Sequence, residues 1–311
     1  MNKVVIVGCG NVGMSYAYAL LNQKNSVNEL VLIDLDKDRI EGEVMDLNHC
    51  LSYAPSKIDI KVGDYSDCTD AKIVVIAAGA NQEVGETRMD LIHKNSKIFK
   101  SIVDSVMSSG FNGVFLIATN PVDVMSYLTF KYSGLPSNKV IGSGTSLDTS
   151  RLRYVIADKL QINPKNVHAY VVGEHGDSEF VLWSSAIIGT QNINDFLTDD
   201  EKDEIHNTVK NAAYEIIKRK GATYYGIGMS LVKITDAILN DKNCVITVST
   251  YDKENDIYIG LPMVLGAGGI KKDLHIKLDG QELANMQNSI NVIKDAIEKI
   301  NWFFSFFCIF F

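Results

Sequence analysis

Residues 4–13 read VVIVGCGNVG, and residues 30–34 read LVLID. In the first stretch, an apolar run meets Gly8, Gly10 and Gly13 and then passes into a helical pattern over residues 11–23. A continuous Val/Ile run predicts a strand covered on both faces, as in a parallel sheet. The second stretch repeats such a strand and ends on Asp34. This strand–turn–helix–strand order predicts the opening of a doubly wound α/β sheet.

The same alternation continues, with apolar strand patterns at residues 73–77, 114–118 and 140–141. The second half differs: we expect a helix over 146–159, a strand over 167–172, a strand pair at 244–250 and 257–261, and long helices near 200–220 and 281–300. The last helix carries an apolar stripe formed by Leu283, Met286, Ile290, Ile293, Ile297 and Ile300. The pattern predicts a Rossmann-type doubly wound parallel sheet over residues 1–143, followed by an α+β substrate domain over 144–311.

Composition narrows the class of protein. The chain has 311 residues and a net charge of −8, which argues against a nucleic-acid partner. Its scattered cysteines predict free thiols in a reducing compartment and no metal site: Cys9, Cys50, Cys68, Cys244 and Cys308. Because Met1 leads straight into a strand without an export signal, we expect a cytoplasmic protein with no membrane partner.

Residues 302–311 read WFFSFFCIFF, an atypical apolar tail. Ten residues are too few to span a bilayer, which needs about 20 in a helix. Packing on the body or on a partner subunit, a membrane-surface anchor, and an abnormal chain end all remain open.

The glycine pattern at residues 8–13 is GxGxxG between a strand and a helix. Gly8 permits a tight turn, Gly10 lets the backbone approach a pyrophosphate, and Gly13 lets helix and strand pack closely. Asp34, about 20 residues later, can bind the ribose hydroxyls of adenosine and repels a 2′-phosphate. The pattern therefore favours NAD over NADP. A plain glycine turn with an incidental Asp is the alternative.

Three residues in the second half of the chain indicate acid–base chemistry. His175 lies in the glycine-flanked turn GEHGD, and a histidine suits the proton that accompanies oxidation of an alcohol. Asp148 and Arg151 are three residues apart on a predicted helix, so they share a face. Asp148 could orient His175, and Arg151 could grip a carboxylate with its planar fork. Taken alone, the spacing favours an ordinary surface ion pair.

Two loops follow strand ends. Residues 81–88 read NQEVGETR and suit a lid over a cofactor crevice, from which Arg88 could polarise a substrate carbonyl. Asn120, in ATNPVD, could donate to the same oxygen or hold the nicotinamide side. An ordinary surface loop and an Asn turn before Pro are the structural alternatives.

Together these segments resemble the L-lactate dehydrogenase branch of the lactate/malate dehydrogenase family, from residue 3 to about 300. The likeness rests on GCGNVG, VLID, AGANQEVGETR, ATNPVD, IGSGTSLDTSR, VVGEHGD and KGATYYGIG. The resemblance implies that His175 donates and accepts the proton, with Asp148 as its partner, Arg151 as the carboxylate clamp and Arg88 as a catalytic lid residue. It implies an enzyme of glycolysis and fermentation with these NAD-binding positions: Gly8, Gly10, Asn11, Val12, Gly13, Asp34, Ala78, Gly79, Thr119 and Asn120.

Substrate choice falls on Gln82 and Thr223. Malate-specific relatives place an Arg at the position of Gln82, to pair the second carboxylate of oxaloacetate. A neutral Gln leaves that carboxylate without a cation, which makes its burial expensive. The resemblance therefore implies pyruvate and L-lactate, held by Gln82, Arg88, Asn120, Arg151 and Thr223.

The resemblance also implies regulation and assembly. Bacterial relatives that respond to fructose 1,6-bisphosphate resemble this chain at Arg153 and His168, a basic pair that could bind phosphate between subunits. We therefore expect activation by this sugar bisphosphate and a homotetramer. A helix-surface Arg and a satisfied strand His are the alternatives.

Some features depart from the family pattern. Glu83 and Val84 stand where relatives often carry Lys and Pro. The stretch at residues 251–256 is shorter than the same stretch in relatives, and the apolar tail at residues 302–311 has no counterpart in the family. Malate or another 2-hydroxy acid remains the rival substrate class. A non-catalytic NAD sensor would leave His175, Asp148 and Arg151 unexplained, and an NAD-using glycosidase would need a Cys/His metal cluster.

Overall fold

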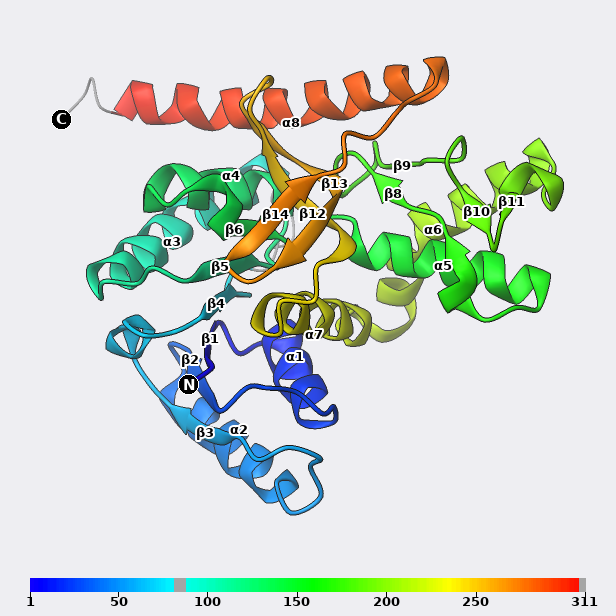
Figure 1. Ribbon diagram of the computed structural model, residues 1–311. Coiled ribbons are helices and arrows are strands. Elements are labelled where there is room, and N and C mark those ends of the chain that lie inside the picture. Colours follow the sequence, from blue (N-terminus) through cyan, green and yellow to red (C-terminus); the bar gives the residue numbers. More distant parts are fainter. Residues whose placement is uncertain (81–87, 308–311) are drawn as a thin grey trace.

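The computed structural model describes the backbone of residues 1–80 and 88–307, and the side chains of residues 1–80 and 90–300. Strands and helices alternate through the first half (Figure 1): β1 (Lys3–Val7), α1 (Asn11–Leu21), β2 (Glu29–Ile33), α2 (Lys37–Cys50), β3 (Asp59–Val62), β4 (Ile73–Ile76), α3 (Arg88–Ser108), β5 (Val114–Ile117), α4 (Val122–Ser133) and β6 (Val140–Gly142). These strands are parallel in the order β3-β2-β1-β4-β5-β6. The predicted doubly wound sheet is confirmed, and α2, β3 and α4 are additional to the elements that the sequence located.

The apolar residues of β1 alternate between two cores. Val5 and Val7 face a core that α3, α4 and the last helix share, while Val4 and Ile6 face a core built with α1 and α2. All four side chains are almost fully buried. The strand is apolar throughout because helices cover both faces of the sheet.

The second half contains α5 (Ser146–Leu160), β7 (Val167–His168), β8 (Val171–Val172), β9 (Phe180–Val181), β10 (Ile187–Ile188), β11 (Gln191–Asn192), α6 (Asp199–Lys220), α7 (Tyr225–Leu239), β12 (Cys244–Asp252), β13 (Ile257–Gly266), β14 (Gly269–Asp273) and α8 (Gly280–Phe307). The predicted strand pair is present as antiparallel β12 and β13. Ser249 of β12 pairs with Gly142 of β6, so one nine-stranded sheet continues past residue 143.

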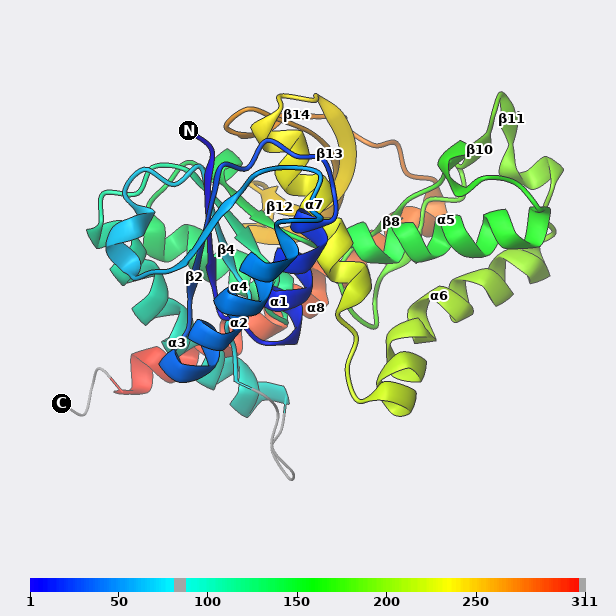
Figure 2. The same ribbon diagram turned by 90° about the horizontal axis from the view of Figure 1, so that it is seen from below.

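Two other groups of elements frame the site. A third core lies between α5, α6 and the short strands, and Figure 2 shows this group to one side of the main sheet. Helix α7 packs on α1, and α8 runs beside α4 and β13 (Figure 1). The sheet edge, α5 and α8 thus surround the turn that carries His175.

Two sequence expectations are wrong. Residues 167–172 do not form one strand: β7 pairs with β10, whereas β8 pairs with β9. Leu283 does not belong to the buried stripe of α8, because its side chain is 61% exposed while Met286, Ile290, Ile293, Ile297 and Ile300 are buried. At that end of α8 the buried residue is Glu282, whose carboxylate accepts hydrogen bonds from Ser184.

Candidate active site

The glycine loop joins β1 to α1 with the predicted geometry. Gly8 has a φ of +93°, a left-handed conformation that favours glycine, and a Cβ there would overlap the backbone of Ala78. A Cβ on Gly13 would overlap the carbonyl oxygen of Gly8, so helix and strand require glycine at this contact. A Cβ on Gly10 would meet no described atom within 4 Å.

The N-terminus of α1 is suited to an anion. Helix α1 begins at Asn11 with Gly10 as its N-cap, and its first turn has neither a side-chain cap nor an acidic residue. Unsatisfied N–H groups and the helix dipole favour negative charge there. Open space above Gly10 and these amides fit the pyrophosphate of a dinucleotide.

Asp34 stands at the end of β2, beside the glycine loop. Its Oδ2 accepts from the Cys9 N–H at 2.7 Å and from Arg39 Nη2 at 3.2 Å. Arg39 also donates to the carbonyl of Cys9 at 2.9 Å. Burial opposes ionisation, but the backbone hydrogen bonds from Cys9 and Asp36 and the charge of Arg39 lower the pKa of Asp34. The carboxylate is therefore held in its charged form beside the glycine loop.

The ends of β4 and β5 are tied together at the same edge of the sheet. Thr119 donates its hydroxyl proton to the carbonyl of Ala78 at 2.7 Å, and a Cβ on Gly79 would lie 2.7 Å from the methyl group of Thr119. Buried Asn95 of α3 accepts from Ala80 N–H and donates to the carbonyl of Asn120. Sequence reasoning missed Asn95, although a polar residue within an apolar helix face was a usable signal.

His175, Asp148 and Arg151 come together as expected. The ring Nδ1 of His175 lies 2.7 Å from Asp148 Oδ2, and Arg151 Nη1 lies 2.8 Å from Asp148 Oδ1. The Asp148 side chain is only 3% exposed, so this is a buried cluster and not a surface ion pair. Burial would lower the pKa of His175, but the charge and hydrogen bond of Asp148 outweigh it and raise that pKa above its ordinary value. Although burial opposes ionisation of Asp148 too, His175 and Arg151 hold its pKa below the usual range.

Asp123 was not among the predicted site residues, and its side chain is hydrogen-bonded to the backbone of the turn that carries His175. Its Oδ2 accepts from the backbone N–H of His175 at 2.8 Å, and its Oδ1 accepts from the Ser249 hydroxyl at 2.5 Å. Burial raises the pKa of Asp123 to about 6, against these two hydrogen bonds. The segment ATNPVD thus contributes a buried acceptor as well as Asn120.

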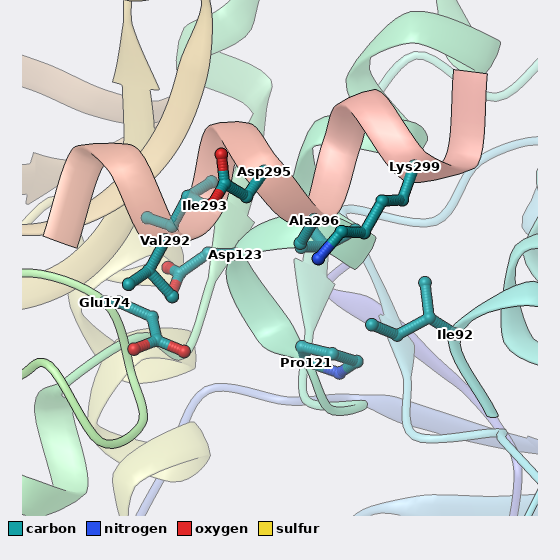
Figure 3. A pocket seen from close by; sticks show the side chains of 10 residues that line it. Ile92, Pro121, Asp123, Glu174, Val292, Ile293, Asp295, Ala296 and Lys299 are labelled. Carbon is teal, nitrogen blue, oxygen red and sulfur yellow. The ribbon is translucent and has the colours of Figure 1, made fainter. Parts of the chain in front are cut away.

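Behind the turn lies a pocket of about 290 Å³. Figure 3 shows α8 along one side, with Val292, Asp295 and Lys299, while Asp123, Glu174 and Pro121 lie across from it. Ser289 of α8 donates to the carbonyl of Ser178 at 2.6 Å, which fixes the helix to the same turn. Helix α8 is therefore part of the support for His175.

The structure describes only some of the remaining predicted site residues. Gln82, Glu83 and Val84 lie outside the described residues, and of Arg88 only the backbone, the first residue of α3, is described. Thr223 lies in the linker before α7, whose Gly226 would overlap Leu147, the neighbour of Asp148, if it carried a Cβ.

The two residues of the expected phosphate pair lie on α5 and β7. Arg153 Nε donates to the carbonyl of Ala169 at 3.1 Å, and its guanidinium lies 4.9 Å from the centre of the Tyr170 ring. His168, next to Ala169, is exposed on β7.

Donor atoms of His175, Asp148 and Glu179 lie within 4.8 Å of one another, a spacing at which they could hold a metal ion. The guanidinium of Arg151 already bonds Asp148 there and opposes a further cation. Within the described chain, no helix combines the length and apolar character needed to span a membrane.

The sheet order and the glycine loop define a dinucleotide-binding protein. Residues 2–142 match the family model described as lactate/malate dehydrogenase, NAD binding domain, and residues 145–304 match lactate/malate dehydrogenase, alpha/beta C-terminal domain. The chain belongs to the lactate/malate dehydrogenase family and binds NAD.

Curated relatives and solved structures agree with this assignment. An L-lactate dehydrogenase of a Geobacillus species is 50% identical over 309 residues, covering 96% of this chain and 97% of the relative. Another, from Halalkalibacterium halodurans, is 51% identical over 298 residues, covering 94% and 96%. A lactate dehydrogenase from a deep-sea metagenome superposes with a TM-score of 0.94 at 51% identity, covering 96% and 99%. The minor L-lactate dehydrogenase of Enterococcus mundtii, in its ligand-bound form, also gives 0.94, at 43% identity, covering 96% and 98%.

Proposed function

We propose that this chain is an L-lactate dehydrogenase that reduces pyruvate to L-lactate with NADH, and runs in reverse with NAD⁺. The observation that carries the proposal is the buried cluster in which Asp148 bonds both the His175 ring and Arg151. An imidazole oriented by a carboxylate beside a guanidinium suits proton transfer to a substrate that carries an acid group. The relatives named L-lactate dehydrogenase support the same substrate pair.

His175 is the proposed proton donor. If Nδ1–H donates to Asp148, the exchangeable proton of the charged ring is on Nε2, the nitrogen left for substrate. The raised pKa of His175 keeps this proton on the ring and available for pyruvate reduction. When the proton is transferred to the substrate oxygen, it neutralises the negative charge that develops there. The bound dinucleotide supplies the hydride. Arg88 and Asn120 are proposed to polarise the carbonyl, and Thr223 to close the pocket.

Arg151 is the proposed clamp for the substrate carboxylate. Its Nη1 is engaged by Asp148, which fixes the plane of the guanidinium and leaves other N–H groups for a second carboxylate. The pyruvate carboxylate would then be held on the same helix that orients His175. Binding and proton transfer would share one rigid element.

The proposed division between cofactor binding and substrate binding follows the two regions that match family models. We propose that residues 1–143 bind NAD through the glycine loop, Asp34 and the strand ends, and that residues 144–311 bind substrate. The family matches at 2–142 and 145–304 support this boundary, although the sheet runs across it.

Gly10 and Gly13 make a matched test of the cofactor site. Gly13→Ala would force the Gly8 carbonyl and α1 apart, so we expect weaker NADH binding and a loss of about 1–3 kcal/mol in the free energy of unfolding. The Cβ of Gly10→Ala meets no atom of the described residues within 4 Å, so this variant should weaken NADH binding with little change in stability. NADH fluorescence titration and denaturant unfolding measure both. Equal NADH affinity in Gly10→Ala and the parent protein would contradict the placement of the pyrophosphate.

Relative rates on three 2-keto acids test the substrate. NADH oxidation should give the highest kcat/KM with pyruvate, a lower value with 2-ketoisocaproate and the lowest with oxaloacetate, because Gln82 offers no cation to a second carboxylate. A preference for oxaloacetate would move the assignment to malate. Binding of NADH without turnover of any keto acid would support a sensor instead.

Arg153 and His168 are the proposed site of activation by fructose 1,6-bisphosphate, in a cytoplasmic homotetramer. We expect the sugar bisphosphate to lower the apparent KM for pyruvate by about 5- to 150-fold, and Arg153→Gln to abolish this response. The control is Lys165→Gln, at an exposed position after α5. Light scattering with and without the ligand reports assembly. No response in the parent protein would reject the proposal, and a lower melting temperature of Arg153→Gln would reveal a structural role through Ala169 and Tyr170.

A further inference from the structure

Glu179 is a second buried carboxylate beside the proposed catalytic pair. The residue precedes β9 and is only 5% exposed. One carboxylate oxygen of Glu179, one of Asp148 and one ring nitrogen of His175 all lie within 4.8 Å of one another. Oε1 of Glu179 is buried and meets no hydrogen-bond partner among the described residues. A buried carboxylate oxygen without a donor is costly if the group is charged.

The two carboxylates differ in their partners. Asp148 has a donor on each oxygen, His175 on Oδ2 and Arg151 on Oδ1, so these two groups stabilise its negative charge. Glu179 has no ion pair of this kind within the described residues. Two buried carboxylates within 4.8 Å of each other disfavour double ionisation, so the carboxyl group with fewer cationic partners takes the proton. Burial, and then the charge of Asp148, raise the pKa of Glu179 well above its usual range.

We propose that Glu179 is a neutral carboxylic acid that donates a hydrogen bond to Asp148 and serves as a positioning residue for His175. This inference rests on the proposed proton-transfer role of His175. A donor to Asp148 draws off part of its negative charge and so weakens its hold on the His175 proton. Proton transfer is most efficient when the donor pKa lies near the working pH. Glu179 thus keeps Asp148 from retaining that proton too strongly.

The other charged groups at this point do not supply the same function. Asp123 of α4 is turned to the backbone N–H of His175 and to Ser249. Arg151 of α5 is bonded to Asp148. His206 of α6 contacts the backbone carbonyl of Glu179 through Nε2 at 3.2 Å, and burial lowers the pKa of His206, so it stays neutral. Asp123 and His206 have other hydrogen-bond partners, and Arg151 and His175 each already bond one oxygen of Asp148, which leaves Glu179 as a third donor to Asp148.

Infrared spectroscopy tests the protonation state without any turnover. In D₂O at neutral pH, the difference spectrum of the parent protein minus Glu179→Gln should contain the C=O stretch of a protonated carboxylic acid. Only the carboxylate bands in that difference would overturn the proposal. Because this measurement needs no substrate, it can fail while the dehydrogenase assignment holds, and can succeed where that assignment fails.

The pH profile of pyruvate reduction tests the positioning role. Glu179→Gln keeps a neutral donor, so the pKa of kcat/KM should stay within about 0.3 units, whereas Glu179→Leu removes the donor and should raise it by about 0.5–1 unit. Asp177→Asn removes an exposed carboxylate from the same turn and is the control. A fall of about one unit in Glu179→Gln would reveal a charged Glu179 and overturn the proposal. An unshifted Glu179→Leu would overturn the positioning role. If Glu179→Leu does not fold, the infrared result and the Glu179→Gln profile still decide.

Removal of metal ions separates a metal site from a hydrogen-bonded cluster. We expect dialysis against EDTA to leave the pH profile unchanged, since the Arg151 guanidinium already pairs with Asp148. Activity that is lost in EDTA and restored by a divalent cation would overturn the proposal.

Discussion

Asp148→Asn is expected to lower kcat for pyruvate reduction by about 10²–10⁴-fold. Both partners of Asp148 are donors: His175 at 2.7 Å on one oxygen and Arg151 at 2.8 Å on the other. An Asn side chain has the same shape but offers one acceptor and one donor. Whichever way the amide turns, it presents an NH₂ group to a donor. The variant must therefore misorient either the imidazole or the guanidinium.

The same substitution should move the pH dependence to lower pH. Asp148 raises the pKa of His175, so removing its charge favours the neutral ring. Reduction needs the protonated ring, and its activity should be lost about 1–3 units lower in pH than in the parent protein. Lactate oxidation needs the neutral ring, so its rising limb should move down by the same amount. Rate profiles in both directions measure this shift.

Asp158→Asn is the matched control, because Asp158 lies exposed on the same helix α5. It should change neither kcat nor the pH profile. A loss of less than about tenfold in Asp148→Asn, with an unmoved profile, would show that His175 does not depend on this carboxylate.

The first half of the fold could be predicted because its signals are local. The apolar run of β1, the glycines after it and Asp34 at the end of β2 lie within 34 residues, and each has a physical requirement that a sequence displays. The structure places Asp34 beside the glycine loop, where its carboxylate accepts from the Cys9 N–H. Periodicity also located α5, α6 and the β12–β13 pair within a few residues.

The proposed active site depends on contacts that spacing does not encode. The spacing of Asp148 and Arg151 by itself favours a surface ion pair, and only tertiary packing buries the pair and brings it to His175. Asp123 and Glu179 were missed for a related reason. A single acidic residue in a sequence gives no sign that it will be buried, because its hydrogen-bond partners come from other elements.

The two errors of the fold have the same origin. Periodicity says which residues share a face of α8, but not how far the protein body extends beneath that face. At the first turn of α8 the body presents Ser184 to Glu282, and Leu283 remains exposed. For residues 167–172, β propensity was real, but β7 and β8 pair with different strands.

Arg151→Leu is expected to lower kcat/KM for pyruvate by about 30- to 4,000-fold, chiefly through KM. Removing one partner of a buried, hydrogen-bonded charge pair costs about 2–5 kcal/mol, and each 1.4 kcal/mol is tenfold. Arg151→Lys keeps the charge but not the planar fork, so its loss should be smaller. NADH affinity should not change, because Arg151 lies on α5 and is not among the residues that we propose to bind NAD.

A keto substrate without a carboxylate separates the two tasks that the structure gives Arg151. If Arg151 acts by binding the acid group, the parent protein and Arg151→Leu should reduce such a ketone or aldehyde at similar, low rates. If Arg151 acts by holding Asp148, the variant should lose as much on this substrate as on pyruvate, and its pH profile should move as well. Since His175 and Arg151 bond different oxygens of Asp148, we expect the bond to His175 to persist without Arg151, and therefore the first result. Equal losses on both substrates would contradict the clamp.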